Sequence, residues 1–218
     1  MSAGGMSPDE HDHVVQAVME ALTAGAVVAI PTDTVYGLAV DPSVPGATEA
    51  LFTLKSRPVD LALPVLVADV AQADRLAGPA GLSPAARTLT GRFWPGALTI
   101  VTARRTGIGW DLGGDQHTIG LRCPDHATVR ALCGRVGPLA TTSANRHGGA
   151  PLVTADEVRA VFGEEVPVLD GGRCHGRPST VVDTTTDPPR LLREGVVPWD
   201  DVLGALSPSR LPPSGAPG

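Results

Sequence analysis

The sequence predicts one α/β domain, on three observations. Short apolar runs alternate with segments whose apolar residues recur every three or four positions, as expected for buried strands and amphipathic helices. Of the 218 residues, 42% are hydrophobic and 18% charged, which is enough for a large core. The 26 glycines and 21 prolines gather between the apolar segments, so we expect many short connections.

The first quarter of the chain predicts a helix, a strand and a second helix. Residues 9–24 place Val14, Val18 and Leu22 on one helical face, and a glycine follows as the stop signal. Residues 26–30 form an apolar run that suits an interior strand. Residues 47–54 again have helical spacing.

The remaining elements follow the same two patterns. We expect strands over residues 63–68, 98–102, 118–122, 138–142, 166–172, 177–183 and 190–195. We expect helices over residues 69–76, 84–90, 126–133 and 154–161, the last opened by a Thr-x-x-Glu capping box. The domain should span residues 9–206, between a disordered leader (1–8) and a disordered tail rich in Pro and Ser (207–218).

Composition excludes several classes of protein. A net charge of −6 and 3% aromatic residues argue against broad nonspecific nucleic-acid binding and base stacking. The three cysteines lack a C-x-x-C spacing, so neither a zinc site nor a disulfide framework is expected. No run approaches the ~18 apolar residues of a membrane span, and the N-terminus has no signal-peptide core. We therefore expect a cytoplasmic protein that contacts no membrane.

Two short motifs suggest a site for anions. Lys55 and Arg57 stand one residue apart, a pair of cations suited to a polyphosphate, although such a triplet is more often a solvated face. Ser143 and Asn145 supply a hydroxyl and an amide at the end of a predicted strand. Arg122 ends another, where a bidentate grip on a carboxylate or phosphate and a structural ion pair are equally compatible with the sequence.

Seven blocks of sequence carry a resemblance to a known family. They are Pro31–Leu38 (PTDTVYGL), Lys55–Pro58 (KSRP), Phe93–Thr99 (FWPGALT), Arg122–His126 (RCPDH), Thr142–Asn145 (TSAN), Pro178–Asp183 (PSTVVD) and Leu192–Gly195 (LREG). On these blocks the chain, from about Val14 to Val202, resembles the YrdC-like family of threonylcarbamoyl-AMP synthases. The resemblance implies a twisted, mixed β-sheet with flanking helices around a deep concave cleft.

The resemblance also implies a reaction and the residues that serve it. L-threonine, bicarbonate and ATP, with Mg²⁺, would give threonylcarbamoyl-AMP and pyrophosphate, and the product would serve N6-threonylcarbamoylation of tRNA adenosine, with tRNA and downstream modification proteins as possible partners. Family positions place one group of residues on ATP: Lys55, Arg57, Thr118, Asn145 and Arg193. They place another on threonine, with Arg122 on its carboxylate: Thr34, Arg122, Ser143 and Ser179. No metal site in the protein itself is implied.

Two positions depart from the family's pattern. Leu61 stands where a polar residue is usual, and Val153 where a threonine is common. Losing two polar contacts at ~1 kcal/mol each would weaken ATP binding by about one to two orders of magnitude, unless Arg146 or His147 substitutes. The departures motivate an alternative, an RNA-binding or regulatory protein without adenylate synthesis. Carbamoyl-adenylate chemistry, as in the related domain of hydrogenase maturation factors, is a weaker third reading.

Overall fold

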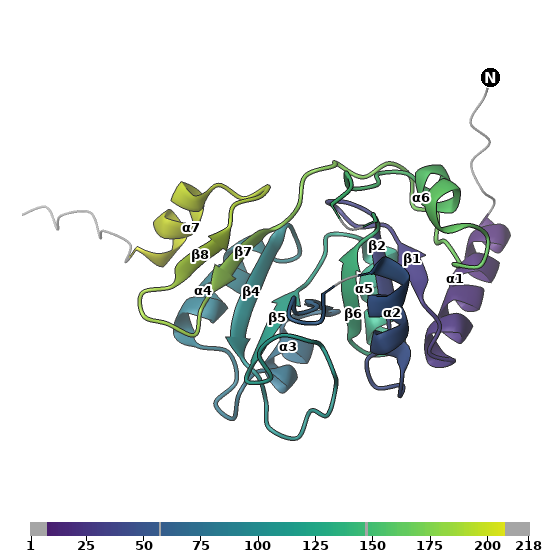
Figure 1. Ribbon diagram of the computed structural model, residues 1–218. Helices are drawn as coiled ribbons and strands as arrows, with labels where there is room; N and C mark the ends of the chain where they lie inside the picture. Colours follow the sequence, from purple (N-terminus) through teal and green to yellow (C-terminus); the bar gives the residue numbers. More distant parts are fainter. Residues whose placement is uncertain (1–7, 57, 147, 208–218) are drawn as a thin grey trace, which may run out of the picture.

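An eight-stranded mixed sheet runs through the computed structural model, which describes residues 8–56, 58–146 and 148–207 (Figure 1). The strand order is β1-β2-β6-β3-β5-β4-β7-β8; β3–β5 and β4–β7 are parallel pairs and the other neighbours antiparallel. The strands are β1 (Val28–Ile30), β2 (Gly37–Val40), β3 (Val65–Leu66), β4 (Leu98–Ala103), β5 (Thr118–Arg122), β6 (Leu139–Ser143), β7 (Thr180–Asp183) and β8 (Arg190–Arg193). The predicted α/β fold with a mixed sheet is confirmed.

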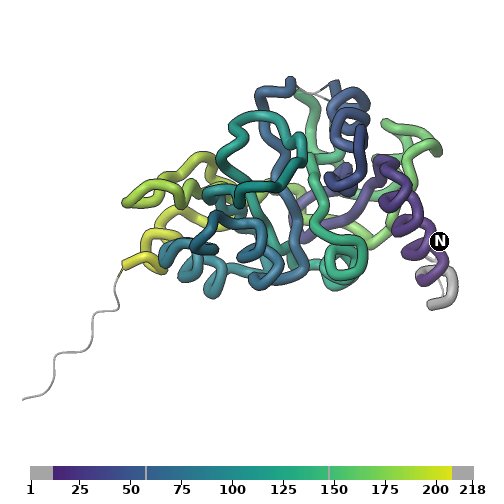
Figure 2. The backbone as a smooth tube through the Cα atoms, turned by 90° about the horizontal axis from the view of Figure 1, so that it is seen from below, coloured from purple at the N-terminus to yellow at the C-terminus, as the bar shows by residue number. Residues whose placement is uncertain are grey.

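Helices pack on both faces of the sheet. They are α1 (Pro8–Thr23), α2 (Ala47–Lys55), α3 (Val70–Leu76), α4 (Pro84–Phe93), α5 (Ala127–Arg135), α6 (Ala155–Phe162) and α7 (Trp199–Leu206). Helices α1 and α5 bury apolar side chains with Ile30 and Ala39, whereas α2 packs with Leu38 and Val40. Because successive strand residues point to opposite faces, α2 covers the face of β2 opposite to α1 and α5. Helices α1 and α7 lie at opposite ends of the molecule (Figure 2).

The half of the sheet built from β5, β4 and β7 is covered differently on its two faces. Leu98, Ile100 and Leu121 are fully buried in the core, where α3 contacts β5 and α4 contacts β4. Thr99 and Val101 alternate with these core residues and line cavities. This face of the sheet is therefore the wall of a site rather than part of the core.

Three elements differ from the sequence prediction. Strand β2 was not predicted. It begins at Gly37, where a Cβ would lie 2.8 Å from Thr141 Oγ1 and 3.3 Å from the Thr142 carbonyl oxygen, so the close packing against β6 favours glycine. Residues 166–172 form no named strand, only an isolated bridge between Val168 and Ala29. Helix α7 was not predicted, although Trp199 and Val202 begin a helical spacing.

The predicted domain boundaries can be compared with the structure only within the described residues. Helix α1 begins at Pro8, one residue before the predicted start. The rest of the expected disordered leader (1–8), and the tail (207–218) beyond Ser207, lie outside the described residues. Within the described residues, no helix has the length and apolar character needed to cross a membrane.

Tyr36 is the chain's one tyrosine, is fully buried, and provides a spectroscopic test of this packing. Its hydroxyl donates to the Gly172 carbonyl oxygen (3.0 Å) and accepts from the Gly171 amide (3.2 Å). Burial, reinforced by the nearby Asp170 carboxylate, raises its pKa from 10.0 to about 12.

We therefore expect the tyrosinate absorbance to appear with a midpoint near pH 12 in the folded protein and near pH 10 in denaturant. Because the folded pKa is the higher one, the linked stability is present below pH 10 and is lost as the pH rises towards 12. A midpoint near 10 while the circular dichroism remains native would contradict the buried environment.

Candidate active site

A cavity of about 320 Å³ lies where several strands end, and all four residues predicted to bind threonine line it. Arg122 is the last residue of β5 and Ser143 the last of β6. Ser179 directly precedes β7, and Thr34 lies in the connection from β1 to β2. The four residues therefore converge on one cavity, two of them from strand ends, and Arg193 of β8 lines the same cavity.

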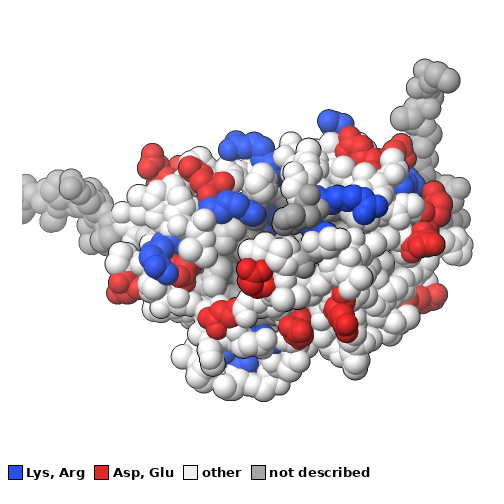
Figure 3. Space-filling model, viewed as in Figure 1, with Lys and Arg blue, Asp and Glu red and all other residues white. Residues whose placement is uncertain are grey.

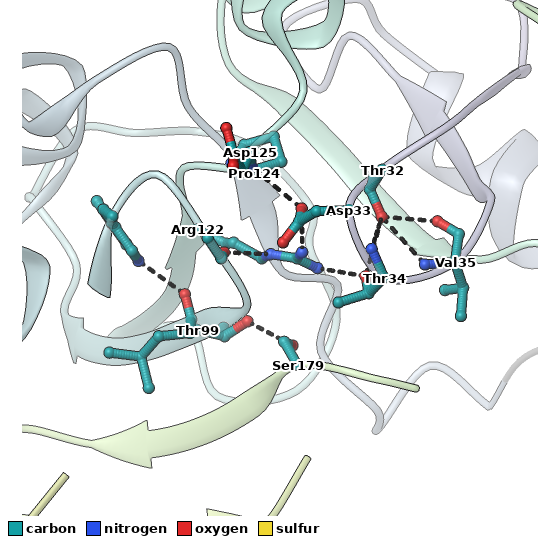
Figure 4. Close-up of polar contacts among 12 residues, drawn as sticks. Thr32, Asp33, Thr34, Val35, Thr99, Arg122, Pro124, Asp125 and Ser179 are labelled. Carbon is teal, nitrogen blue, oxygen red and sulfur yellow. Dashed lines mark hydrogen bonds and ion pairs between the residues drawn. The ribbon is translucent and has the colours of Figure 1, made fainter. Parts of the chain in front are cut away.

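Arg122 is held by three protein acceptors (Figure 4). Its Nε donates to the Gly96 carbonyl oxygen (3.0 Å), Nη1 to Thr34 Oγ1 (2.8 Å) and Nη2 to Asp33 Oδ1 (2.6 Å). The pair with Asp33 is nearly buried, with side-chain exposures of 8% and 15%. A guanidinium has five N–H groups, so two remain for a ligand. The structural ion pair is therefore observed, with Asp33, a partner that sequence reasoning did not identify, and the grip on a carboxylate stays a prediction.

The hydroxyl of Thr34 has a defined orientation. Thr32 Oγ1 donates to the Val35 carbonyl oxygen (2.7 Å), so the 2.9 Å contact between the two threonine hydroxyls uses the Thr34 proton. Thr34 Oγ1 also accepts from Arg122. Since a hydroxyl has one proton and two lone pairs, Thr34 presents one lone pair to the cavity and acts there as an acceptor.

Lys55, at the last position of α2, joins the KSRP and TSAN motifs. Its Nζ donates to the Ser143 carbonyl oxygen, to Ser143 Oγ (3.2 Å) and to Asn145 Oδ1 (2.7 Å). The Asn145 amide is fixed because its Nδ2 donates to the carbonyl oxygens of Arg146 and Gly149. Ser143 Oγ donates to Asn145 Oδ1 (2.6 Å), so its hydroxyl, like that of Thr34, offers a lone pair. Lys55 is buried and is the only lysine in the sequence.

Ser179 and Arg193 form the wall of the cavity on the side of β7 and β8. Arg193 donates through Nε and Nη2 to the Ser179 carbonyl oxygen (3.2 and 2.9 Å) and through Nη2 to Ser179 Oγ (3.2 Å). Ser179 Oγ also contacts Thr99 Oγ1 at 2.9 Å, a partner that the sequence did not indicate. Position 195 packs so closely against this turn that it requires glycine, because a Cβ there would overlap the Pro178 carbonyl oxygen.

A second cavity of about 220 Å³ adjoins the first, and Thr118, predicted to contact ATP, lines it. Thr118 Oγ1 donates to Asp115 Oδ2 at 3.4 Å. The two cavities share four lining residues, namely Pro64, Thr99, Ser179 and Arg193. The four described residues predicted to bind ATP fall in two places: Thr118 and Arg193 line the second cavity, and Lys55 and Asn145 contact Ser143.

The charge of the site favours an anion. Burial lowers the pKa of Arg122, an effect that Asp33 opposes and Arg193 reinforces, and partial burial lowers the pKa of Arg193. An anion bound between the two guanidinium groups would relieve that unfavourable desolvation and repulsion. On the face seen in Figure 3, several Lys and Arg side chains lie across the middle, and acidic side chains lie both above and below them.

The other candidate site residues named in the sequence analysis do not line either cavity or lie outside the described residues. Arg57 and His147 lie outside the described residues. Leu61 is 45% exposed, and Val153 is half-buried with its amide donating to Glu157. Arg146 donates to the Val161 carbonyl oxygen and stacks on Phe162, 5.9 Å from the ring centroid. In this arrangement Arg146 points to α6 and does not replace the contacts missing at Leu61 and Val153.

The part of the chain described here offers no group of three or more His, Cys, Asp and Glu side chains that could hold a metal ion. The carboxylate of Asp33, beside the larger cavity, is already paired with Arg122. The donor set therefore does not fit a metal cage made by the protein.

Comparison with known proteins places this geometry in a family. The model of the Sua5/YciO/YrdC family, described as "Telomere recombination", matches residues 20–195. A Mycobacterium leprae protein is 38% identical over 207 residues, covering 93% of each chain. The threonylcarbamoyl-AMP synthase of Yersinia enterocolitica is 35% identical over 194 residues, covering 87% of this chain and 100% of its own.

Among solved structures, the crystal structure of P. abyssi Sua5 complexed with L-threonine superposes with a TM-score of 0.84 at 32% identity. The match covers 90% of this chain and 58% of that one. Sequence and fold agree, and the chain belongs to the Sua5/YciO/YrdC family.

Proposed function

We propose that this protein is an L-threonylcarbamoyladenylate synthase, which converts L-threonine, bicarbonate and ATP to threonylcarbamoyl-AMP and pyrophosphate. One observation carries the proposal: Thr34, Arg122, Ser143 and Ser179 converge on a single cavity that adjoins a second, with Arg193 on the wall between them. The relatives named threonylcarbamoyl-AMP synthase and the threonine complex of P. abyssi Sua5 support it.

This reaction requires the site to neutralise the negative charge of its substrates more than to transfer protons. The amine of threonine attacks the carbon of bicarbonate, and loss of water leaves a carboxylate on the nitrogen. That carboxylate attacks the α-phosphorus of ATP, and pyrophosphate leaves. Positioned cations and N–H donors are the groups that stabilise charge at a phosphoryl centre, and arginine and lysine supply them here.

Threonine is assigned to the larger cavity. The two N–H groups of Arg122 that remain would hold its carboxylate, while the lone pairs of Thr34 and Ser143 would accept from its amino group. Ser179, fixed by Arg193 and Thr99, would hold the opposite side.

ATP is assigned to the second cavity and its border with the first. Arg193 and Thr118 would contact the nucleotide there, and Lys55, Arg57 and Asn145 the phosphates. Lys55 already donates to three acceptors, so a phosphate oxygen would take the place of one of them.

Mg²⁺ would enter with the nucleotide. Because the described residues offer it no cage, its ligands would be phosphate oxygens and water, a common arrangement for this ion. The product would feed threonylcarbamoylation of tRNA adenosine through downstream modification proteins, a role that would suit a cytoplasmic protein.

The test is an assay of pyrophosphate release with each substrate omitted in turn. We expect release only when L-threonine, bicarbonate and ATP are all present. Release that does not need threonine but needs carbamoyl phosphate would support carbamoyl-adenylate chemistry. No release under any condition, together with RNA binding, would support the binding-protein alternative motivated by Leu61 and Val153.

A ranking of amino acids tests the larger cavity. Valine is nearly isosteric with threonine but leaves a buried partner of the hydroxyl unpaired, which costs about 1–3 kcal/mol, whereas serine loses a single methyl, about 0.8 kcal/mol. We therefore expect the thermal shift to fall in the order threonine, serine, valine, with and without ATP and Mg²⁺. An equal shift with all three amino acids would contradict the assignment.

A further inference from the structure

Gly120 occupies the middle of the strand that carries both candidate substrate contacts. In β5, Thr118, Gly120 and Arg122 alternate with the core residues Ile119 and Leu121, so the three share the face that lines the cavities. Thr118 lines the second cavity and Arg122 the first. Gly120, which lies between them in the strand, lines the second cavity.

A side chain at position 120 would point to the place where the cavities adjoin. An added Cβ would meet Pro64 Cβ at 3.5 Å and Thr99 Cγ2 at 3.8 Å, both ordinary van der Waals contacts. Pro64 and Thr99 are two of the residues that line both cavities. The backbone of Gly120 lies outside the left-handed region, so neither a clash nor an unusual dihedral requires glycine here.

We propose that Gly120 is a positioning residue whose missing side chain keeps the two cavities connected. On the proposed function, which this inference presupposes, the carboxylate formed on threonine must reach the α-phosphorus of ATP across this border. Reacting atoms need to approach to about 3–3.5 Å, and a misplacement of about 1 Å can cost roughly 100-fold in rate. A methyl carbon placed between the carboxylate and the phosphate would stay about 3.5–4.0 Å from each of them, and would therefore hold the two reacting groups apart.

The other walls of the border cannot move aside easily. Thr99 and Ser179 are hydrogen-bonded to each other, and Arg193 donates to both the carbonyl oxygen and the hydroxyl of Ser179. Gly120 itself is paired with Val101 of β4 in the sheet. A branched side chain at position 120 would therefore displace the substrates rather than the protein.

The experiment is steady-state kinetics of pyrophosphate release by Gly120→Val, with calorimetric titration of threonine and of ATP separately. We expect kcat to fall by about 100-fold or more while each substrate still binds within about three-fold of the wild type, because each cavity retains its own contacts. Gly120→Ala should lose about ten-fold less activity than the valine variant. Gly91→Ala, in α4 with nothing within 4 Å of its Cβ, is the control for an added methyl away from the site.

Each outcome decides between the possibilities. Wild-type kcat in Gly120→Val would overturn the inference and leave the proposed function intact. A variant that loses binding of one substrate would do the same, since the added side chain would then act within one cavity and not at the border between the two. An inactive wild type would overturn the proposed function itself. Valine is a strong strand former, so Gly120→Val is expected to fold. If circular dichroism shows that it does not, Gly120→Ala provides the test. A lower kcat with both affinities unchanged would support the inference, and an unchanged kcat would overturn it.

Discussion

Replacing Lys55 by methionine is expected to lower the rate of pyrophosphate release by about 10²–10³-fold. The change removes the one ammonium that links α2 to Ser143 and Asn145, and with it the cation proposed to meet the phosphates. Lys55→Arg should rescue little, because a planar guanidinium cannot donate in three directions from one nitrogen. The measurement is initial rate at saturating substrates.

The control addresses a purely structural role. A cation in the last turn of a helix complements the helix dipole, and Arg75 has that position in α3 with an exposed side chain. Arg75→Met should therefore change stability by less than about 1 kcal/mol and leave the rate unaltered. If Lys55→Met behaved like Arg75→Met, the phosphate role of Lys55 would be wrong.

Replacing Arg122 by alanine should raise the threonine requirement by about 100-fold or more while the ATP requirement changes only a few-fold. The variant loses the guanidinium proposed to bind the threonine carboxylate. It also leaves the nearly buried Asp33 carboxylate without its cation, which should lower the free energy of unfolding by roughly 3–5 kcal/mol. Kinetics at low temperature, where the variant remains folded by circular dichroism, separate the two effects.

Arg87→Ala is the matched control, since Arg87 pairs with Asp74 with side chains 51% and 37% exposed, and should cost at most about 1 kcal/mol. Arg122→Lys adds a second comparison, because it keeps the charge and loses the bidentate fork. Equal changes in the threonine and ATP requirements of Arg122→Ala would mean that Arg122 serves only the structure.

Much of the fold could be predicted from local patterns. The helix over residues 154–161 was predicted from its capping box, and the structure shows both reciprocal bonds of that box between Thr154 and Glu157. Strand β2 was missed because its start, Gly37, reads as a turn, and only pairing with β1 and β6 makes it a strand. Residues 166–172 were predicted to be a strand because the run is apolar. The pattern does not reveal that the segment pairs with the sheet through a single isolated bridge, between Val168 and Ala29.

The site was predicted one residue at a time, and its partners were not. The motifs pointed to Arg122 and Ser179, yet Asp33 and Thr99, which hold them, come from segments about eighty to ninety residues away in sequence. The alternation of Thr99 between Leu98 and Ile100 was a signal for its cavity-facing side, but it does not name a partner. Gly120 belongs to no sequence motif, and the role proposed for it follows only from its place in the second cavity beside residues that line both cavities.

The most direct test of the central claim is the identity of the product. Incubation of the protein with L-threonine, ATP, Mg²⁺ and carbon-13 bicarbonate, followed immediately by mass spectrometry, is expected to yield an AMP conjugate that contains threonine and carries the added isotope. The label must lie in the carbamoyl carbon, because bicarbonate supplies that atom. A conjugate without the isotope, or AMP and pyrophosphate with no conjugate at any time point, would contradict threonylcarbamoyl-adenylate synthesis.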